Sequence, residues 1–162
     1  MDLAGSAAAS DDATRWNDTA PTATVFSIGT GVSVNASTDT FLFTAFHDVE
    51  GYSKFGSYEG NADADGPFIY LGFRPALMLF RHVDGVEHWS EYDYAREPNN
   101  VQTVKLYPNL VNAQATTVQG DRLSNGFKIR SSGDQNSSST YVYMAWAEYP
   151  FGGSGSTQAR AV

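Results

Sequence analysis

Short runs of alternating polar and apolar residues, separated by Gly, Pro, Asn and Asp, fill this chain from residue 24 onward. Such alternation places successive side chains on opposite faces of a β-strand. No segment keeps the roughly 3.6-residue period of an amphipathic helix over three turns. Strands are therefore expected at residues 40–46, 68–73, 76–83, 86–94, 101–107, 126–130 and 141–147. Their length and spacing predict an all-β fold, an antiparallel β-sandwich of jelly-roll or concanavalin-like type.

The composition favours the same fold and excludes several classes of function. Aromatic residues make up 14% and charged residues only 17% of the chain, against roughly 25% charged in an average domain. A net charge of −8 without a basic cluster argues against nucleic-acid binding. The absence of Cys excludes disulfides, thiolate metal sites and thiol nucleophiles. The apolar runs are too short for membrane insertion.

Three regions are expected along the chain. Residues 1–23 are mostly Ala, Ser, Asp and Thr with one large apolar residue, Trp16, and predict an irregular N-terminal arm or linker. Residues 24–155 carry the predicted sandwich, and residues 156–162 form a C-terminal tail. The start has neither a basic nor a long apolar region, so we expect no Sec-type export signal.

A weak internal repeat suggests a second domain boundary. Residues 24–52 align with residues 125–152, so that Phe41 falls on Tyr141 and Phe43 on Tyr143. Two related hairpins would explain this match, although alternation alone produces part of it. If the repeat is real, residues 24–52 form a hairpin of their own and the true domain covers about residues 53–152.

Several longer motifs carry a family resemblance. These are GYSKFGSYEGNADADGPFIYLGFRPALMLFR (51–81), LYPN (106–109), DRLSNGFKIR (121–130) and TYVYMAWAEYPFGG (140–153). In this order and over most of residues 24–155, they resemble a family of bacteriophage tail and tail-fibre proteins common in marine phages. The resemblance implies a concanavalin-like sandwich with a structural role on the virion and no enzymatic activity.

The same resemblance implies an environment and partners. Virion proteins assemble in the bacterial cytoplasm, which agrees with the lack of Cys. Phage fibres are commonly trimers, so the expected partners are other virion proteins and copies of this chain. The arm of residues 1–23 is the segment expected to contact a neighbouring subunit.

One acidic cluster invites comparison with glycosidases of sandwich fold. Those enzymes place two carboxylates on one face of a strand, as nucleophile and general acid. Here Glu91, Asp93 and Glu97 follow one another, but Arg96 stands where the second Glu of the longer motif belongs, and Pro98 follows Glu97 at once. We expect a solvated strand face, no catalytic residue and no enzyme.

The acidic turn at 61–65 and the histidines are the candidates for a metal site. Asn61, Asp63 and Asp65 match the first ligand positions of a calcium loop, but Gly72 stands where a bidentate Glu belongs. A tight turn rich in Asx residues is the preferred interpretation of this run, and we expect neither metal nor cofactor.

The three histidines are His47, His82 and His88, and none is paired at a metal-binding spacing. His82 continues the alternation of Met78 and Phe80, which predicts a histidine at the edge of the core.

Aromatic residues near loops are the remaining candidates for contact with a glycan or a partner. Sugar rings stack on Tyr and Trp, and nearby polar groups bind their hydroxyls. The candidates are Tyr52, Tyr58, Trp89, Tyr92 and Tyr94. Tyr92 and Tyr94 share one strand face and Trp89 lies on the other, so at least one of these sets is expected to be core.

Together these observations predict a virion subunit of a tail fibre or tail appendage that takes part in host attachment, with glycan binding as its mechanism. Weak contacts to a host glycan would add by avidity across several copies. A capsid decoration or tail-scaffold protein that binds only other virion proteins is the alternative. A glycan-degrading enzyme is the third and least supported hypothesis.

Overall fold

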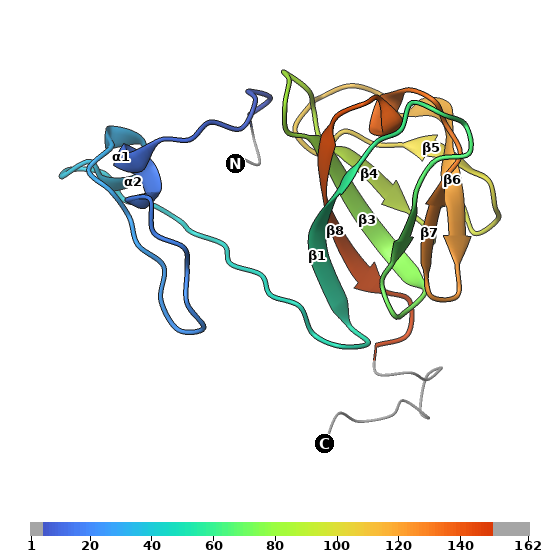
Figure 1. Cartoon of the computed structure of the whole chain (residues 1–162), viewed down its shortest axis with the longest axis horizontal. Helices are drawn as coiled ribbons and strands as arrows, with labels where there is room; N and C mark the ends of the chain where they lie inside the picture. Colours follow the sequence, from blue (N-terminus) through green and yellow to red (C-terminus); the bar gives the residue numbers. More distant parts are fainter. Residues whose placement is uncertain (1–4, 151–162) are drawn as a thin grey trace. The chain divides into compact units, whose positions relative to one another are not determined.

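The computed structural model of this protein describes residues 5–150, which divide into two compact units. One is Ser10–Ala45. The other joins residues 5–9 to the chain from Phe46 onward, and it contains every strand described below (Figure 1). The sequence boundary was expected after residue 23, whereas the compact units part after Ala45. The predicted tail, residues 156–162, lies outside the described residues.

Eight strands form two antiparallel sheets of four strands each. The first sheet has the order β1-β8-β3-β4, with β1 at Ser53–Glu59, β8 at Thr140–Ala147, β3 at Pro75–His82 and β4 at Ser90–Asp93. The second has the order β2-β7-β6-β5, with β2 at Phe68–Tyr70, β7 at Gly126–Ile129, β6 at Ala115–Leu123 and β5 at Gln102–Lys105.

The strand order confirms the predicted antiparallel β-sandwich. In one sheet β1 pairs with β8, and in the other β2 pairs with β7, so strands from the two ends of the sequence lie side by side in both layers (Figure 1). This nesting is typical of jelly rolls, in which the chain folds back on itself as two Greek keys. Residues far apart in the sequence are thereby brought to the same end of the sandwich.

Aromatic rings fill the space between the two sheets. Phe127 of β7 meets Phe80 of β3 edge to face, with ring centroids 5.1 Å apart. It also contacts Tyr143 of β8 at 5.9 Å and Tyr58 of β1 at 6.2 Å. Edge-to-face pairs add about 0.5–1.5 kcal/mol each beyond their burial. Phe127 therefore joins the second sheet to three strands of the first.

Two sequence predictions of secondary structure are wrong. Residues 40–46 form no strand, and residues 24–52 form no hairpin, because this segment folds as loop with one short helix and a single bridge between Val49 and Ser53. Conversely, β1 and β6 were not predicted. In β6 the buried side chains are Gln119 and Arg122, so the usual apolar alternation is missing.

Helices contribute little to this fold. The described residues contain α1 at Ala13–Trp16, α2 at Val32–Asn35 and the 3-10 helix η1 at Asp134–Asn136. Within residues 5–150, no helix has the length and apolar character needed to cross a bilayer.

The small unit Ser10–Ala45 has little interior. Its aromatic cluster contains Trp16, Phe26 and Phe43, with centroid distances of 5.4–6.5 Å. Gly29 donates its N–H to the Arg15 carbonyl, and a Cβ at this position would lie 2.2 Å from the Thr14 carbonyl oxygen, so only glycine fits. Val34 is the buried hydrophobic side chain of the unit, and most of its other residues are exposed.

In the sandwich, η1 closes one end through a fully buried asparagine. The two amide hydrogens of Asn136 are shared among three acceptors, Asn61 Oδ1 and the carbonyls of Asp63 and Ser131, at N–O distances of 2.7–2.8 Å. Its Oδ1 accepts the Asn61 N–H at 2.9 Å. Asn136 is 0% exposed. One side chain thus holds the loop after β1 to the segment between β7 and β8.

Replacing this asparagine is expected to destabilise the sandwich strongly. Asn136→Ala leaves several buried donors and acceptors without partners, and each such group costs about 1–3 kcal/mol. We expect a loss of about 3 kcal/mol in the free energy of unfolding, measured by urea denaturation. The control is Asn112→Ala in an exposed loop, which should change stability by less than about 0.5 kcal/mol. Equal stability of both variants would contradict this assignment.

Candidate functional site

A polar pocket lies where β3 ends and β4 and β8 begin. The antiparallel register places Phe80 opposite both Ser90 and Tyr143, and His82 opposite Tyr141, so these strand ends meet at one edge. The pocket has a volume of about 230 Å³. The residues that line it are Phe80, Arg81, His82, Glu87, His88, Ser90, Asp134, Gln135, Ser137 and Tyr141.

Asp134 forms part of the wall, and its carboxylate is fully engaged. Lys105 Nζ lies 2.6 Å from Oδ2 and 2.8 Å from Oδ1. Gln119 donates to Oδ2 at 2.9 Å, and Gln135 donates to Oδ1 at 3.0 Å. The backbone of Asp134 has a φ of 52°, which is rare for a residue other than glycine. The ion pair with Lys105 and the two amides hold it there.

Gln135 connects the pocket wall to the core. It is buried, and its amide nitrogen donates to Ser90 Oγ at 2.8 Å. Its amide oxygen accepts the Tyr92 hydroxyl at 2.9 Å, and its carbonyl accepts the Tyr58 hydroxyl at 2.8 Å. The side chain and the backbone of Gln135 are therefore both held by hydrogen bonds to strands of the first sheet.

Tyr58 and Tyr92, whose hydroxyls donate to Gln135, remain protonated. Burial is the main cause that raises the pKa of both Tyr58 and Tyr92 well above its ordinary value, and the Asp134 carboxylate raises both further. Tyr141 donates to the Asp134 carbonyl at 2.8 Å, and its ring stacks on Tyr58 with centroids 5.3 Å apart. These hydroxyls hold the wall in place.

Residues 5–9 fasten the loop that forms the other side of the pocket. Ala9 donates its N–H to the Val83 carbonyl at 2.8 Å, and Glu87 donates its N–H to the Ser6 carbonyl at 3.0 Å. The buried Arg81 guanidinium donates to the Ala7 carbonyl and lies over the Trp89 ring, 5.7 Å from its centroid. This segment contacts the sandwich through its backbone groups, because its Gly, Ser and Ala residues have only small side chains.

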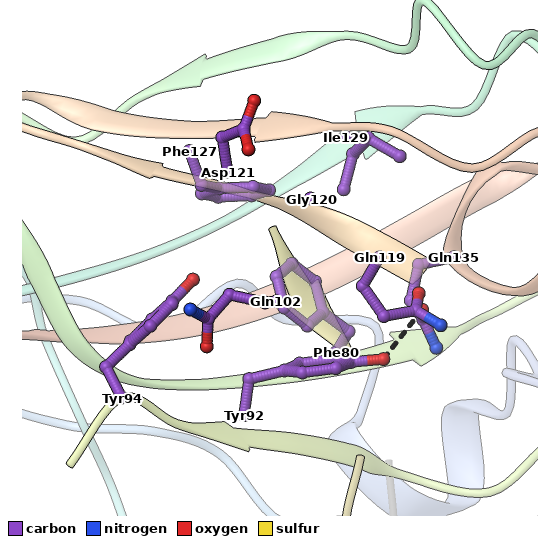
Figure 2. A pocket seen from close by; sticks show the side chains of 10 residues that line it. All are labelled: Phe80, Tyr92, Tyr94, Gln102, Gln119, Gly120, Asp121, Phe127, Ile129 and Gln135. Carbon is purple, nitrogen blue, oxygen red and sulfur yellow. Dashed lines mark hydrogen bonds between the residues drawn. The ribbon is translucent and has the colours of Figure 1, made fainter. Parts of the chain in front are cut away.

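A second cavity lies inside the sandwich but is far smaller. It is lined by Tyr92, Gln102, Gln119 and six other residues around Gln135, as Figure 2 shows, and its volume is about 20 Å³. That is room for about one water molecule. The dashed contact in Figure 2 is the hydrogen bond from Tyr92 to Gln135. Of the two cavities described here, the pocket at the sandwich end is the one large enough for an organic ligand.

Burial contradicts three of the predicted contact residues. Trp89, Tyr92 and Tyr94 are 1%, 2% and 5% exposed, so their rings are core and present no face to a sugar. Tyr58 also packs against the core. Tyr52 is 41% exposed, but it precedes β1 at the end of the sheet opposite to Tyr141. The five aromatic residues therefore form no common surface.

The acidic turn after β1 uses its side chains for its own structure. Asn61 Oδ1 accepts the Asp63 N–H at 3.1 Å, and Asp63 Oδ1 accepts the Asp65 N–H at 2.8 Å. Lys128 forms an ion pair with Asp65 at 2.8 Å. These are Asx turns closed by a salt bridge. Across residues 5–150, no group of three His, Asp or Glu side chains could hold a metal ion.

The acidic cluster after Trp89 is likewise structural in its geometry. Glu97 accepts hydrogen bonds from the N–H groups of Thr103 and Val104 at 2.6 and 2.8 Å and from the Thr103 hydroxyl at 2.7 Å. Asp93 accepts the Ala95 N–H at 2.9 Å. Glu97 therefore caps the start of β5 and is not paired with Glu91 across a groove.

In the sequence, no pattern links His82 and His88 to each other or to a common site. The pocket joins them with Arg81, Glu87 and the η1 residues because the antiparallel order brings distant segments to one end. No local spacing in the sequence signals this grouping. The strand order unites these residues, and the sequence shows only parts of it, such as the tight turn at 124–125 and the alternation of 141–147.

The comparisons with known proteins assign a family but no activity. A family model described as a domain of unknown function, DUF7483, matches residues 1–150. The chain belongs to this family. Among curated proteins and among solved structures, no match was found. The concanavalin-like relationship and the virion origin expected from the sequence therefore remain predictions.

The capping role of Glu97 predicts a pH dependence. Burial is the largest single influence and raises its pKa, but the hydrogen bonds from Thr103 and Val104 outweigh it and hold the pKa below the usual 4.5. Because the folded pKa is lowered, the stabilisation is complete above about pH 4.5 and is lost as pH falls through the folded value. Glu97→Gln should lower the free energy of unfolding by roughly 1 kcal/mol at pH 7.

This difference between the wild type and Glu97→Gln should narrow below about pH 4.5 in urea denaturation series. Glu91→Gln removes a carboxylate from nearby β4 and serves as the control, with no expected change in stability. A gap for Glu97→Gln that stays constant down to pH 3 would refute the capping role.

Proposed function

We propose that this chain is a structural subunit of a bacteriophage virion, in a tail fibre or a related tail appendage that takes part in host attachment. The observation that carries the assembly role is the unit Ser10–Ala45. A folded unit of fewer than roughly 40 residues generally needs disulfides, a metal or a partner chain. This unit is below that size and the protein has no Cys.

The surface of this unit supports contact with another protein. Leu42 is 93% exposed and Val32 is 79% exposed, and Val25 and Phe26 are exposed as well. Residues 19–38 contain no charged side chain, so that two copies could meet there without like-charge repulsion. Burial of these side chains by neighbouring subunits would supply the stabilisation that the unit lacks alone.

The resemblance to tail and tail-fibre proteins supports a virion as the assembly. It rests on the motifs in β1, β3, β7 and β8, which include the strands that build the sandwich. The alternative is a capsid decoration or scaffold protein, which the exposed apolar side chains of Ser10–Ala45 would serve equally well. Location on the particle separates the two proposals.

Immunogold electron microscopy of purified phage particles, with antibody against this chain, tests the location. Label on fibres or at the tail tip is expected. Label over the head would favour the decoration protein, and particles without label would overturn the virion proposal.

Substitutions in the small unit test the assembly role. Val32→Asp combined with Leu42→Asp places charge on the exposed apolar surface and should reduce the oligomer, measured by size-exclusion chromatography with light scattering, to monomers. Val111→Asp is the matched control, because Val111 is fully exposed on a loop of the sandwich. A wild-type protein that is monomeric at all concentrations, or an oligomer that survives both substitutions, would contradict self-association through this unit.

A further inference from the structure

In the polar pocket at the sandwich end, the polar groups of η1 and of Tyr141 already have hydrogen-bond partners. The Asp134 carboxylate is occupied by Lys105, Gln119 and Gln135, and the Tyr141 hydroxyl is occupied by the Asp134 carbonyl and Ser137. These groups shape the pocket but have little capacity left for a ligand. The groups that retain capacity are His82, Glu87, His88 and Ser90.

His82 lines the pocket and carries a buried polar atom. Its Nε2 is inaccessible to solvent and has no hydrogen-bond partner, while its ring lies 5.3 Å from that of Tyr141. A buried polar atom without a partner costs about 1–3 kcal/mol. A ligand hydroxyl reaches this nitrogen only if the atoms that cover it move aside, and it then serves either tautomer, because a hydroxyl both donates and accepts.

The neighbouring groups supply donors and an acceptor. His88 Nδ1 faces the Asn109 amide nitrogen at 3.1 Å, which can only donate, so the proton of this ring lies on Nε2. Ser90 Oγ accepts from Gln135, which leaves its own hydrogen to donate. Glu87 is an acceptor at the exposed side, and its backbone is held by Ser6.

Charge and size restrict what this combination can bind. The lining contains two carboxylates, Glu87 and Asp134, and one guanidinium, Arg81. Lys105 neutralises Asp134, so the pocket has no excess of positive charge to attract an anion. The net charge of −8 on the whole chain then disfavours phosphate, sulfate and other anions. The volume of about 230 Å³ is below the roughly 300–1,000 Å³ of sites for drug-sized ligands. A single ring with several hydroxyl groups satisfies both limits.

We infer that this pocket binds one neutral sugar ring, with His82 and Glu87 as its main polar contacts. The inference does not depend on the virion proposal, because it rests only on the sandwich. Phage attachment would be one use of such a site, and the two proposals fail separately.

Saturation-transfer difference NMR on the full chain tests the site directly. The probes are D-glucose, D-galactose, D-mannose and N-acetyl-D-glucosamine, with D-glucuronic acid as the anionic counterpart. We expect at least one neutral sugar to bind, and Glu87→Gln and His82→Ala each to weaken it about tenfold. Glu87 is exposed, so its variant keeps the fold even if His82→Ala is destabilised.

Matched controls lie at the other end of the sheet. His47→Ala and Glu50→Gln change an exposed histidine and an exposed carboxylate near the start of β1 and should leave binding unchanged. The inference is overturned if no neutral sugar binds, if only glucuronic acid binds, or if the pocket variants and the controls behave alike.

Discussion

The turn at Asp134–Asn136, in which Gln135 and Asn136 are buried, is the feature on which the functional end of this sandwich depends. Its three side chains face three different parts of the molecule. Asp134 binds Lys105 of β5, Gln135 binds Ser90 and Tyr92 of β4, and Asn136 binds the loop after β1. Since β4 and β5 belong to different sheets, the turn ties the two layers together by polar contacts as well as by the aromatic core.

The same turn forms one wall of the pocket, and a loop forms the other side. The polar groups that the turn contacts already have hydrogen-bond partners. The loop from Val83 to Trp89 contributes Glu87 and His88 to the pocket, and residues 5–9 hold this loop by backbone hydrogen bonds. A preorganised site of this kind binds without first ordering its own side chains, which saves part of the entropy of association. We propose ligand binding as the role of this site. Glu97, from the acidic cluster, is committed to the β5 cap.

The sequence predicted the parts of the fold that follow from local pattern. The strands at 76–83, 126–130 and 141–147 alternate clearly and lie close to β3, β7 and β8. β6 escaped prediction because its inward side chains, Gln119 and Arg122, are polar and find partners across the sandwich. The aromatic residues of 40–46 suggested a strand, but Phe43 packs on Trp16 in a loop-rich unit. The pocket could not be predicted, since strand order and not spacing unites its residues.

Amide hydrogen exchange tests the central claim, that the turn at Asp134–Asn136 is as stable as the core. The N–H of Asn61 donates to Asn136 Oδ1 at 2.9 Å, and the N–H of Ala62 donates to the Asn136 carbonyl at 2.7 Å. Both lie in a loop, where exchange is normally fast. The account predicts that they exchange as slowly as the amide of Tyr143 in β8, through global unfolding. Exchange as fast as that of exposed loop amides such as Val111 would contradict it.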